Sequence, residues 1–230
     1  DHYQGGRHEF PMEKAKVEKY YESSKYRNLE IGSVKWPMSV VRIKGNNKNE
    51  VIDAAMDIFE AWKMYSDEEN DILDIPHNTV TPIARRKGDA FELDIVLRNN
   101  RTSAEHPDGI FHPHKELHHI KKENIGLIEV MGLAVLPGRL EKELDIIANI
   151  LCGELDYNRE EAERNNEINK HIPWIEKMLR ENSSLNYIEA KELLKKEVGF
   201  IFSKVLEDAG VFKRNKKGQA GLDKFLNQVL

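Results

Sequence analysis

The first residues of the chain combine a histidine, an amide and a pair of glycines. His2 and Gln4 are two positions apart, so on an extended segment both side chains project from one face. A neutral imidazole can attack a phosphoryl group, and a neighbouring amide can donate a hydrogen bond to the phosphoryl oxygens. Gly5 and Gly6 would let the backbone approach a phosphate closely. The spacing predicts a phosphoryl-transfer site, and the alternative is an ordinary loop.

Four more histidines lie close together near the middle of the chain. His112 and His114 flank a proline, which excludes a helix and favours an extended segment with both imidazoles on one face. Such a pair can reach one phosphate or one metal ion, and Glu116 or an upstream carboxylate could add a metal ligand. His118 and His119 are adjacent, so on a strand they point in opposite directions. The alternative is that all four are surface or hydrogen-bonded structural histidines.

Composition excludes several classes of protein. The 230 residues are 40% hydrophobic and 33% charged, which is typical of a globular chain, and 35 basic against 40 acidic residues argue against nucleic acid as the main partner. One cysteine, Cys152, excludes an internal disulfide framework. Because there is no long apolar run and no signal peptide, we expect a cytoplasmic protein that does not contact a membrane. The chain begins at Asp1 instead of Met, so we expect a fragment whose upstream part is missing.

The first part of the chain has the pattern of a sheet with a packed helix. Residues 39–43 are short and β-branched, which favours a strand. Asn47 and Glu50 have the spacing of a capping box and precede an amphipathic stripe, which predicts a helix. Residues 79–86 and 90–98 flank a glycine turn, and the second run alternates, so they predict a half-buried antiparallel hairpin.

The remaining segments divide the chain into an α+β body over residues 1–137 and a helical region over residues 138–230. Residues 14–25 are compatible with a helix, and the apolar residues 125–136 predict a central strand. Residues 213–217 are expected to form a solvated basic loop. Helical patterns cover residues 140–151, 172–181, 187–209 and 222–230.

Several long stretches carry a resemblance to one family, the galactose-1-phosphate uridylyltransferases of the second, bacterial class. The resemblance covers essentially the whole chain, which is similar to the C-terminal half of a family member. The stretches that carry it are residues 1–11, 36–39, 99–103, 111–114 and 132–140.

The resemblance implies a histidine-triad-like antiparallel sheet with packed helices, and ping-pong transfer of UMP between UDP-glucose and galactose 1-phosphate. It makes His2 the nucleophile and Gln4 its amide partner, whereas the first histidine of the family's motif would precede Asp1. Arg7 would assist the diphosphate, or is a surface arginine. Residues 125–136 do not reproduce the first class's polar sugar contacts, so no hexose-binding residue is transferred.

The first class of the family also holds a structural metal, which suggests a divalent ion, zinc or iron, in this chain. Its ligands would be His112, His114 and Glu18, with Glu13 in place of Glu18 if one residue is inserted. No organic cofactor is expected, and a homodimer is compatible with the resemblance. Two alternatives remain: a histidine-triad nucleotide hydrolase, and a non-catalytic C-terminal lobe. We expect the 230-residue chain by itself to show little or no transfer activity.

Overall fold

The structure is a computed structural model that describes residues 3–73 and 77–230. It contains two compact units, each built from separate segments of the chain. The described parts of residues 1–112, 124–133 and 206–230 form unit 1, and residues 113–123 and 134–205 form unit 2. These units are groups of residues in mutual contact, so the division into domains at residues 137 and 138 stays a prediction.

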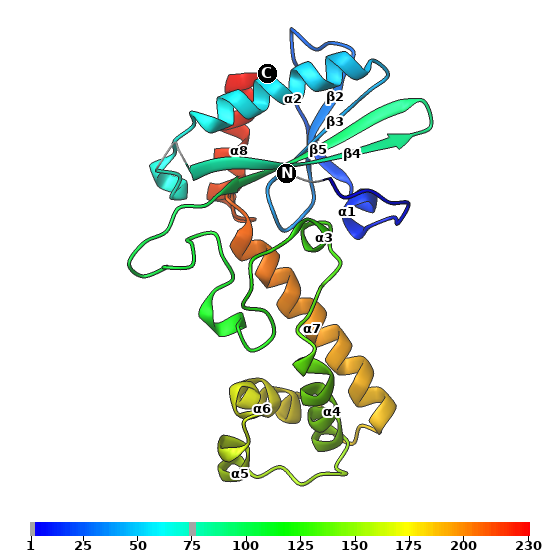
Figure 1. Ribbon diagram of the computed structural model, residues 1–230, viewed down its shortest axis with the longest axis vertical. Coiled ribbons are helices and arrows are strands. Elements are labelled where there is room, and N and C mark those ends of the chain that lie inside the picture. Colours follow the sequence, from blue (N-terminus) through cyan, green and yellow to red (C-terminus); the bar gives the residue numbers. More distant parts are fainter. Residues whose placement is uncertain (1–2, 74–76) are drawn as a thin grey trace. The chain divides into compact units, whose positions relative to one another are not determined.

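Unit 1 is organised around a five-stranded antiparallel sheet, which confirms the α+β class (Figure 1). The strand order is β1-β2-β3-β5-β4, and every neighbouring pair is antiparallel. Both the predicted strand at residues 39–43 and the predicted hairpin are confirmed, and Gly88 in the hairpin turn has a φ of +61°. The strands are β1 (Val17–Tyr20), β2 (Glu30–Val34), β3 (Val40–Gly45), β4 (Asn78–Lys87) and β5 (Ala90–Asn99).

Residues 14–25 do not form the helix with which their composition is compatible. Instead, β1 lies within them and pairs with β2 as an edge strand of the sheet. Their helical pattern has no strong apolar face, so helix formation offers little burial. The backbone hydrogen bonds of the sheet edge therefore decide the conformation.

One face of the sheet is covered by α2 (Lys48–Lys63) and α8 (Lys216–Val229), and the apolar core of unit 1 lies there. The predicted start of α2 is confirmed: Oδ1 of Asn47 accepts hydrogen bonds from the backbone N–H groups of Asn49 and Glu50. Trp62 of α2 is fully buried and contacts the rings of Phe212 and Phe225. This packing fixes the position of the sheet beneath the two helices.

The prediction of a central strand at residues 125–136 is wrong. This segment contains the short helix α3 (Leu127–Val130), and the backbone N–H of Gly126 donates to the Glu129 carboxylate at 2.9 Å. Gly132 then has a φ of +97°, which strands do not use. The cap and the glycine end the regular backbone, so an apolar run that resembles a strand becomes a helical turn followed by extended chain.

Unit 2 is helical, and the helices predicted at residues 140–151 and 172–181 are confirmed as α4 (Arg139–Leu151) and α6 (Ile172–Glu181). The helix α5 (Arg159–Arg164) lies between them. The predicted helix at residues 187–209 is α7 (Tyr187–Ala209), whose last residues belong to unit 1. In the described part of the chain, no helix combines the length and the apolar character needed to cross a membrane.

The basic segment at residues 213–217 is only in part the predicted solvated loop: residues 214–217 are exposed, but Lys213 is half-buried and Lys216 and Lys217 belong to α8 (Lys216–Val229). Nζ of Lys213 donates hydrogen bonds to the carbonyl groups of Glu207 and Asp208 at the end of α7, and it lies over the ring of Phe111. Burial lowers the pKa of Lys213. The helix α8 then begins at Lys216, because Oδ1 of Asn215 caps it. Lys213 and Asn215 thus supply hydrogen-bond partners for free carbonyl groups at the end of α7 and for a free N–H group at the start of α8.

Candidate functional site

The predicted nucleophile segment precedes the short helix α1 (Pro11–Lys14). Gln4 and Arg7 are exposed, and so are the two glycines between them. His2, the predicted nucleophile, lies outside the described residues. The structure therefore describes the amide, the arginine and the chain that leads from them into the sheet, and the chemistry of His2 stays a prediction.

The residues that follow this segment are tied to unit 1 by backbone hydrogen bonds. Met12 of α1 is fully buried, and its N–H donates to the carbonyl oxygen of Met131 at 3.1 Å. Arg42 on β3 donates from Nη2 to the Met12 carbonyl and from Nη1 to the Ala15 carbonyl, both at 2.9 Å. One side chain thus fixes both ends of a turn that begins a few residues after Gln4.

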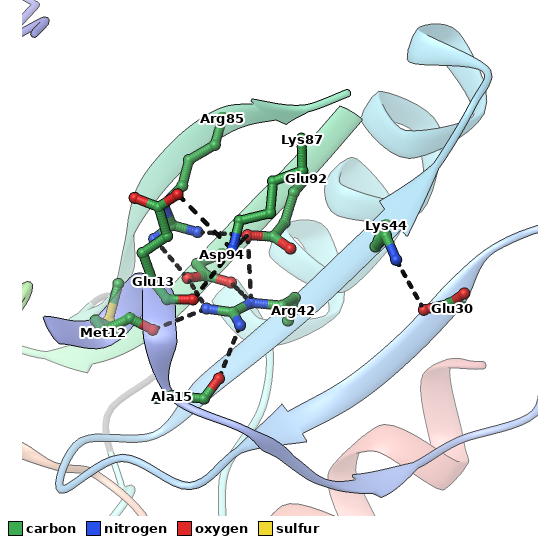
Figure 2. Close-up of polar contacts among 10 residues, drawn as sticks. All are labelled: Met12, Glu13, Ala15, Glu30, Arg42, Lys44, Arg85, Lys87, Glu92 and Asp94. Atoms are coloured by element: carbon green, nitrogen blue, oxygen red, sulfur yellow. Dashed lines mark hydrogen bonds and ion pairs between the residues drawn. The ribbon is translucent and has the colours of Figure 1, made fainter. Parts of the chain in front are cut away.

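Arg42 belongs to a buried network of charged side chains on the sheet (Figure 2). Its guanidinium makes a bidentate contact with Asp94 on β5, with Nε–Oδ1 at 2.7 Å and Nη2–Oδ2 at 2.8 Å. Arg85 on β4 donates to Asp94 at 2.7 Å and to Glu92 at 3.0 Å. Asp94 is fully buried and Glu92 nearly so. The strand β5 is therefore largely buried on both faces, and the prediction of a half-buried hairpin is wrong for β5, whereas most of β4 is partly or fully exposed.

Strand register explains why these charges meet. Asp94 is paired with Arg42 across β3 and β5, and Glu92 is paired with Arg85 across β4 and β5. Paired residues on antiparallel strands project from the same face, so opposite charges neutralise one another in pairs. The sequence contains a partial signal for this network, because charged residues recur at every second position of three strands. Only the register shows which of them are neighbours.

The electrostatics of Arg42 favour its charged form. Burial acts to lower the pKa of Arg42, but the hydrogen bonds that it donates to Asp94 and the charges of Asp94, Glu92 and Glu13 raise it. A guanidinium that keeps its proton cannot act as an acid or base at neutral pH. Arg42 therefore serves to anchor the segment over the sheet.

A pocket of about 390 Å³ lies beside the network on the same unit. Arg42 and Glu92 contribute to its wall, and Lys44 on β3 contacts Glu30 on β2 at 3.5 Å (Figure 2). The volume is within the range of small-molecule sites. Its walls are mixed in charge, so it suits a polar ligand. The residues that line it are Lys16, Val17, Tyr20, Glu30, Arg42, Lys44 and Glu92.

Three of the stretches that carry the family resemblance meet in unit 1. Nε1 of Trp36 donates to the carbonyl oxygen of Val130 at 3.0 Å. A side chain added at Gly132 would lie 2.8 Å from the Trp36 ring and 3.0 Å from Cβ of Pro11. Pro11 ends the first stretch, Trp36 begins the second, and Gly132 begins the last. A glycine is required at position 132 because both its φ and this close approach exclude a side chain.

Of the three residues predicted to bind a metal, Glu18 is engaged in another contact in the described structure. Glu18 on β1 makes a bidentate ion pair with Arg214, at 2.5 and 2.8 Å, and this hydrogen bond lowers the pKa of Glu18. His112 and His114 are half-buried, and they belong to different units. Among residues 3–73 and 77–230, no three histidine, cysteine or acidic side chains are arranged to hold a metal ion. The metal and its ligands therefore stay a prediction, and we derive no step through a metal.

Comparisons with known proteins identify the class. The family described as galactose-1-phosphate uridyl transferase, C-terminal domain, matches residues 1–164. This match covers more than half of the chain, and the chain belongs to the galactose-1-phosphate uridylyltransferase family. The resemblance stated from the sequence is thereby confirmed. No solved structure matches the chain.

Individual relatives agree with the family. The chain is 52% identical to the galactose-1-phosphate uridylyltransferase of Halalkalibacterium halodurans, over 100% of this chain and 46% of that protein. It is 51% identical to the enzyme of that name from Fusobacterium nucleatum, over 100% and 46%. With the Bacillus subtilis protein of the same name it shares 50% identity over 100% and 45%. The chain thus spans about half the length of the curated relatives that it matches.

Proposed function

We propose that this chain is the C-terminal part of an enzyme that transfers UMP from UDP-glucose to galactose 1-phosphate, a step of galactose metabolism. The observation that carries the proposal is the match of the whole chain to proteins of that name at about 50% identity. The matched family begins at residue 1 and so includes His2 and Gln4. Because the relatives are twice as long, the activity is assigned to the complete transferase and the chain supplies part of its site.

The proposed reaction has two halves. An imidazole nitrogen of His2 attacks the α-phosphorus of UDP-glucose, the bond from that phosphorus to the bridging oxygen breaks, and glucose 1-phosphate leaves with the oxygen. A phosphate oxygen of galactose 1-phosphate then attacks the same phosphorus, and the phosphorus–nitrogen bond breaks to restore His2. Imidazole suits both halves, since with a pKa of roughly 6.5 it is a neutral nucleophile at pH 7 and also a good leaving group.

Gln4 and Arg7 would stabilise the negative charge that develops on the phosphoryl group. The Gln4 amide can donate a hydrogen bond to a nonbridging oxygen, and a donor of this kind contributes roughly 3 kcal/mol to a transition state. Arg7 can neutralise the diphosphate. Their exposure on a segment whose following turn is anchored by Arg42 supports these roles.

The test uses the complete transferase with His2 replaced by glycine. We expect it to lose transfer from UDP-glucose, and we expect the unchanged enzyme to carry labelled UMP on His2 when galactose 1-phosphate is withheld. Normal turnover of the His2→Gly variant, or label on another residue, would overturn the assignment. Exchange of labelled glucose 1-phosphate into UDP-glucose without net hydrolysis distinguishes the transferase from a nucleotide hydrolase.

A further inference from the structure

Unit 2 contains a chain of hydrogen bonds that the proposed reaction does not use. Nδ1 of His119 lies 2.8 Å from Nδ1 of His171, and Nε2 of His171 lies 3.1 Å from a carboxylate oxygen of Glu143. His171 is fully buried and Glu143 is nearly so. The ring of Trp174 packs against both imidazoles. These contacts join a carboxylate to two imidazoles in series.

The charges around the pair favour neutral imidazoles. Burial lowers the pKa of His171, against the opposing effect of Glu143. Burial together with the charges of His171 and Arg139 lowers the pKa of His119 to about 4. Glu143 already accepts hydrogen bonds from Arg139 at 2.6 Å and from Lys170. A protonated His171 would be a third cation on the same carboxylate and would be repelled by the other two. Both histidines are therefore neutral at pH 7.

Neutrality determines where the two protons lie. A neutral imidazole has one N–H group, and Nε2 of His171 must carry it because the atom faces a carboxylate. Nδ1 of His171 is then an acceptor, so Nδ1 of His119 must be the donor in the contact between the two rings. The remaining nitrogen, Nε2 of His119, has no proton. Glu143 and His171 thereby fix the tautomer of His119.

This bare nitrogen is accessible. Nε2 of His119 has no hydrogen-bond partner among the residues that the structure describes, and the side chain of His119 is only partly buried. It therefore reaches the surface. Two cations, Arg139 and Lys170, share the single negative charge of Glu143, which leaves one positive charge beside it. Arg139 also donates to the backbone carbonyl of His119 at 3.1 Å.

We propose that His119 is a binding residue for a hydroxylated anion, with Nε2 accepting a hydrogen bond from a ligand hydroxyl group, and that Glu143 and His171 are its positioning residues. The lone pair on Nε2 of His119 requires a hydrogen-bond donor, and the net positive charge of Arg139, Lys170 and Glu143 favours an anion. A phosphorylated sugar has both properties. The choice of a sugar phosphate rests on the proposed function, whereas the tautomer of His119 does not.

Nitrogen NMR of the ¹⁵N-histidine-labelled 230-residue chain tests the tautomer directly. At pH 7 we expect Nε2 of His119 to have the shift of an unprotonated ring nitrogen and Nδ1 that of a protonated one. In His171→Phe, which keeps a buried ring but removes the relay, His119 should revert to the usual mixture of tautomers. Trp174→Phe is the matched control, since it alters packing against both rings and leaves the relay intact. A protonated Nε2 in the unchanged protein would overturn the proposal, whether or not the variants fold.

Titration with galactose 1-phosphate and, separately, with inorganic sulfate, an anion without a hydroxyl group at pH 7, tests the ligand. A saturable change in the Nε2 shift that occurs with galactose 1-phosphate alone would support the hydroxyl contact. An equal change with sulfate, or no change with either anion, would overturn it. The result is independent of His2: a His2→Gly chain should bind galactose 1-phosphate at His119 as before. Failure of uridylyl transfer to His2 and failure of this site can therefore be told apart.

Discussion

The guanidinium of Arg42 and the carboxylate of Asp94 form a bidentate pair beneath the segment that follows the predicted nucleophile. Asp94 is fully buried, and the two nitrogen–oxygen distances are 2.7 and 2.8 Å. The same guanidinium donates to the carbonyl groups of Met12 and Ala15. One buried charge thus joins the sheet to the chain that leads from Gln4 into it.

The first prediction concerns this pair. Arg42→Met should lower the free energy of unfolding by about 3–5 kcal/mol, because it leaves Asp94 buried with less compensation and removes the donors to two carbonyl groups. Urea unfolding followed by circular dichroism measures the loss, and limited proteolysis should cut residues 3–16 faster. Lys44→Met on the same strand is the control, since its pair with Glu30 is exposed and should cost no more than about 1 kcal/mol. Equal losses in the two variants would contradict the anchoring role.

The second prediction concerns Gly132. Gly132→Ala should destabilise the chain by about 2 kcal/mol or more, because alanine is strained at a φ of +97° and its Cβ would meet the Trp36 ring at 2.8 Å. The emission of Trp36 should also shift as its ring is displaced. Gly88→Ala is the matched control: it has a φ of +61°, and nothing lies within 4 Å of an added Cβ. The difference between the two variants measures the contacts with Trp36 and Pro11 together with the greater backbone strain at Gly132, and no difference would contradict both.

The third prediction is a loss of stability on acidification. The pKa of His119 is lowered to about 4 and that of His171 is also lowered, so the unfolded chain binds protons more readily than the folded one. Stability that is fully present above pH 6.5 should fall as the pH drops from about 6.5 towards 4. Thermal unfolding at a series of pH values measures the slope. A double variant, His119→Phe with His171→Phe, should reduce that slope, and an unchanged slope would mean that other groups cause it.

The fourth prediction concerns Gln4 in the complete transferase. Gln4→Ala should reduce kcat by about 100-fold or more if the amide donates to the phosphoryl group in the transition state. Single-turnover formation of the labelled enzyme measures the step in which this donor acts. Tyr3→Phe is a neighbouring control on the same exposed segment and should retain the rate. A Gln4→Ala enzyme with normal kcat would remove Gln4 from the mechanism.

The sequence by itself determined the features that depend on local chemistry. Asn47 and Glu50 predicted the start of α2, and the glycine turn predicted the hairpin, because caps and turns are set by side chains a few residues apart. The long matched stretches indicated the family. The strand predicted at residues 125–136 failed because Glu129 caps a helical turn there and Gly132 has a φ of +97°, with the ring of distant Trp36 packed against it.

Only the tertiary structure decided which charged residues are neighbours. Glu92 and Asp94 alternate with apolar residues and so have the pattern of a solvated face, yet the strand register places them on Arg42 and Arg85 beneath the N-terminal segment. In the same way, His119 and His171 are 52 positions apart, and no local pattern connects them. Register and packing are set by contacts summed over the whole sheet and helices, so the position of a charge within them cannot be obtained from its immediate sequence.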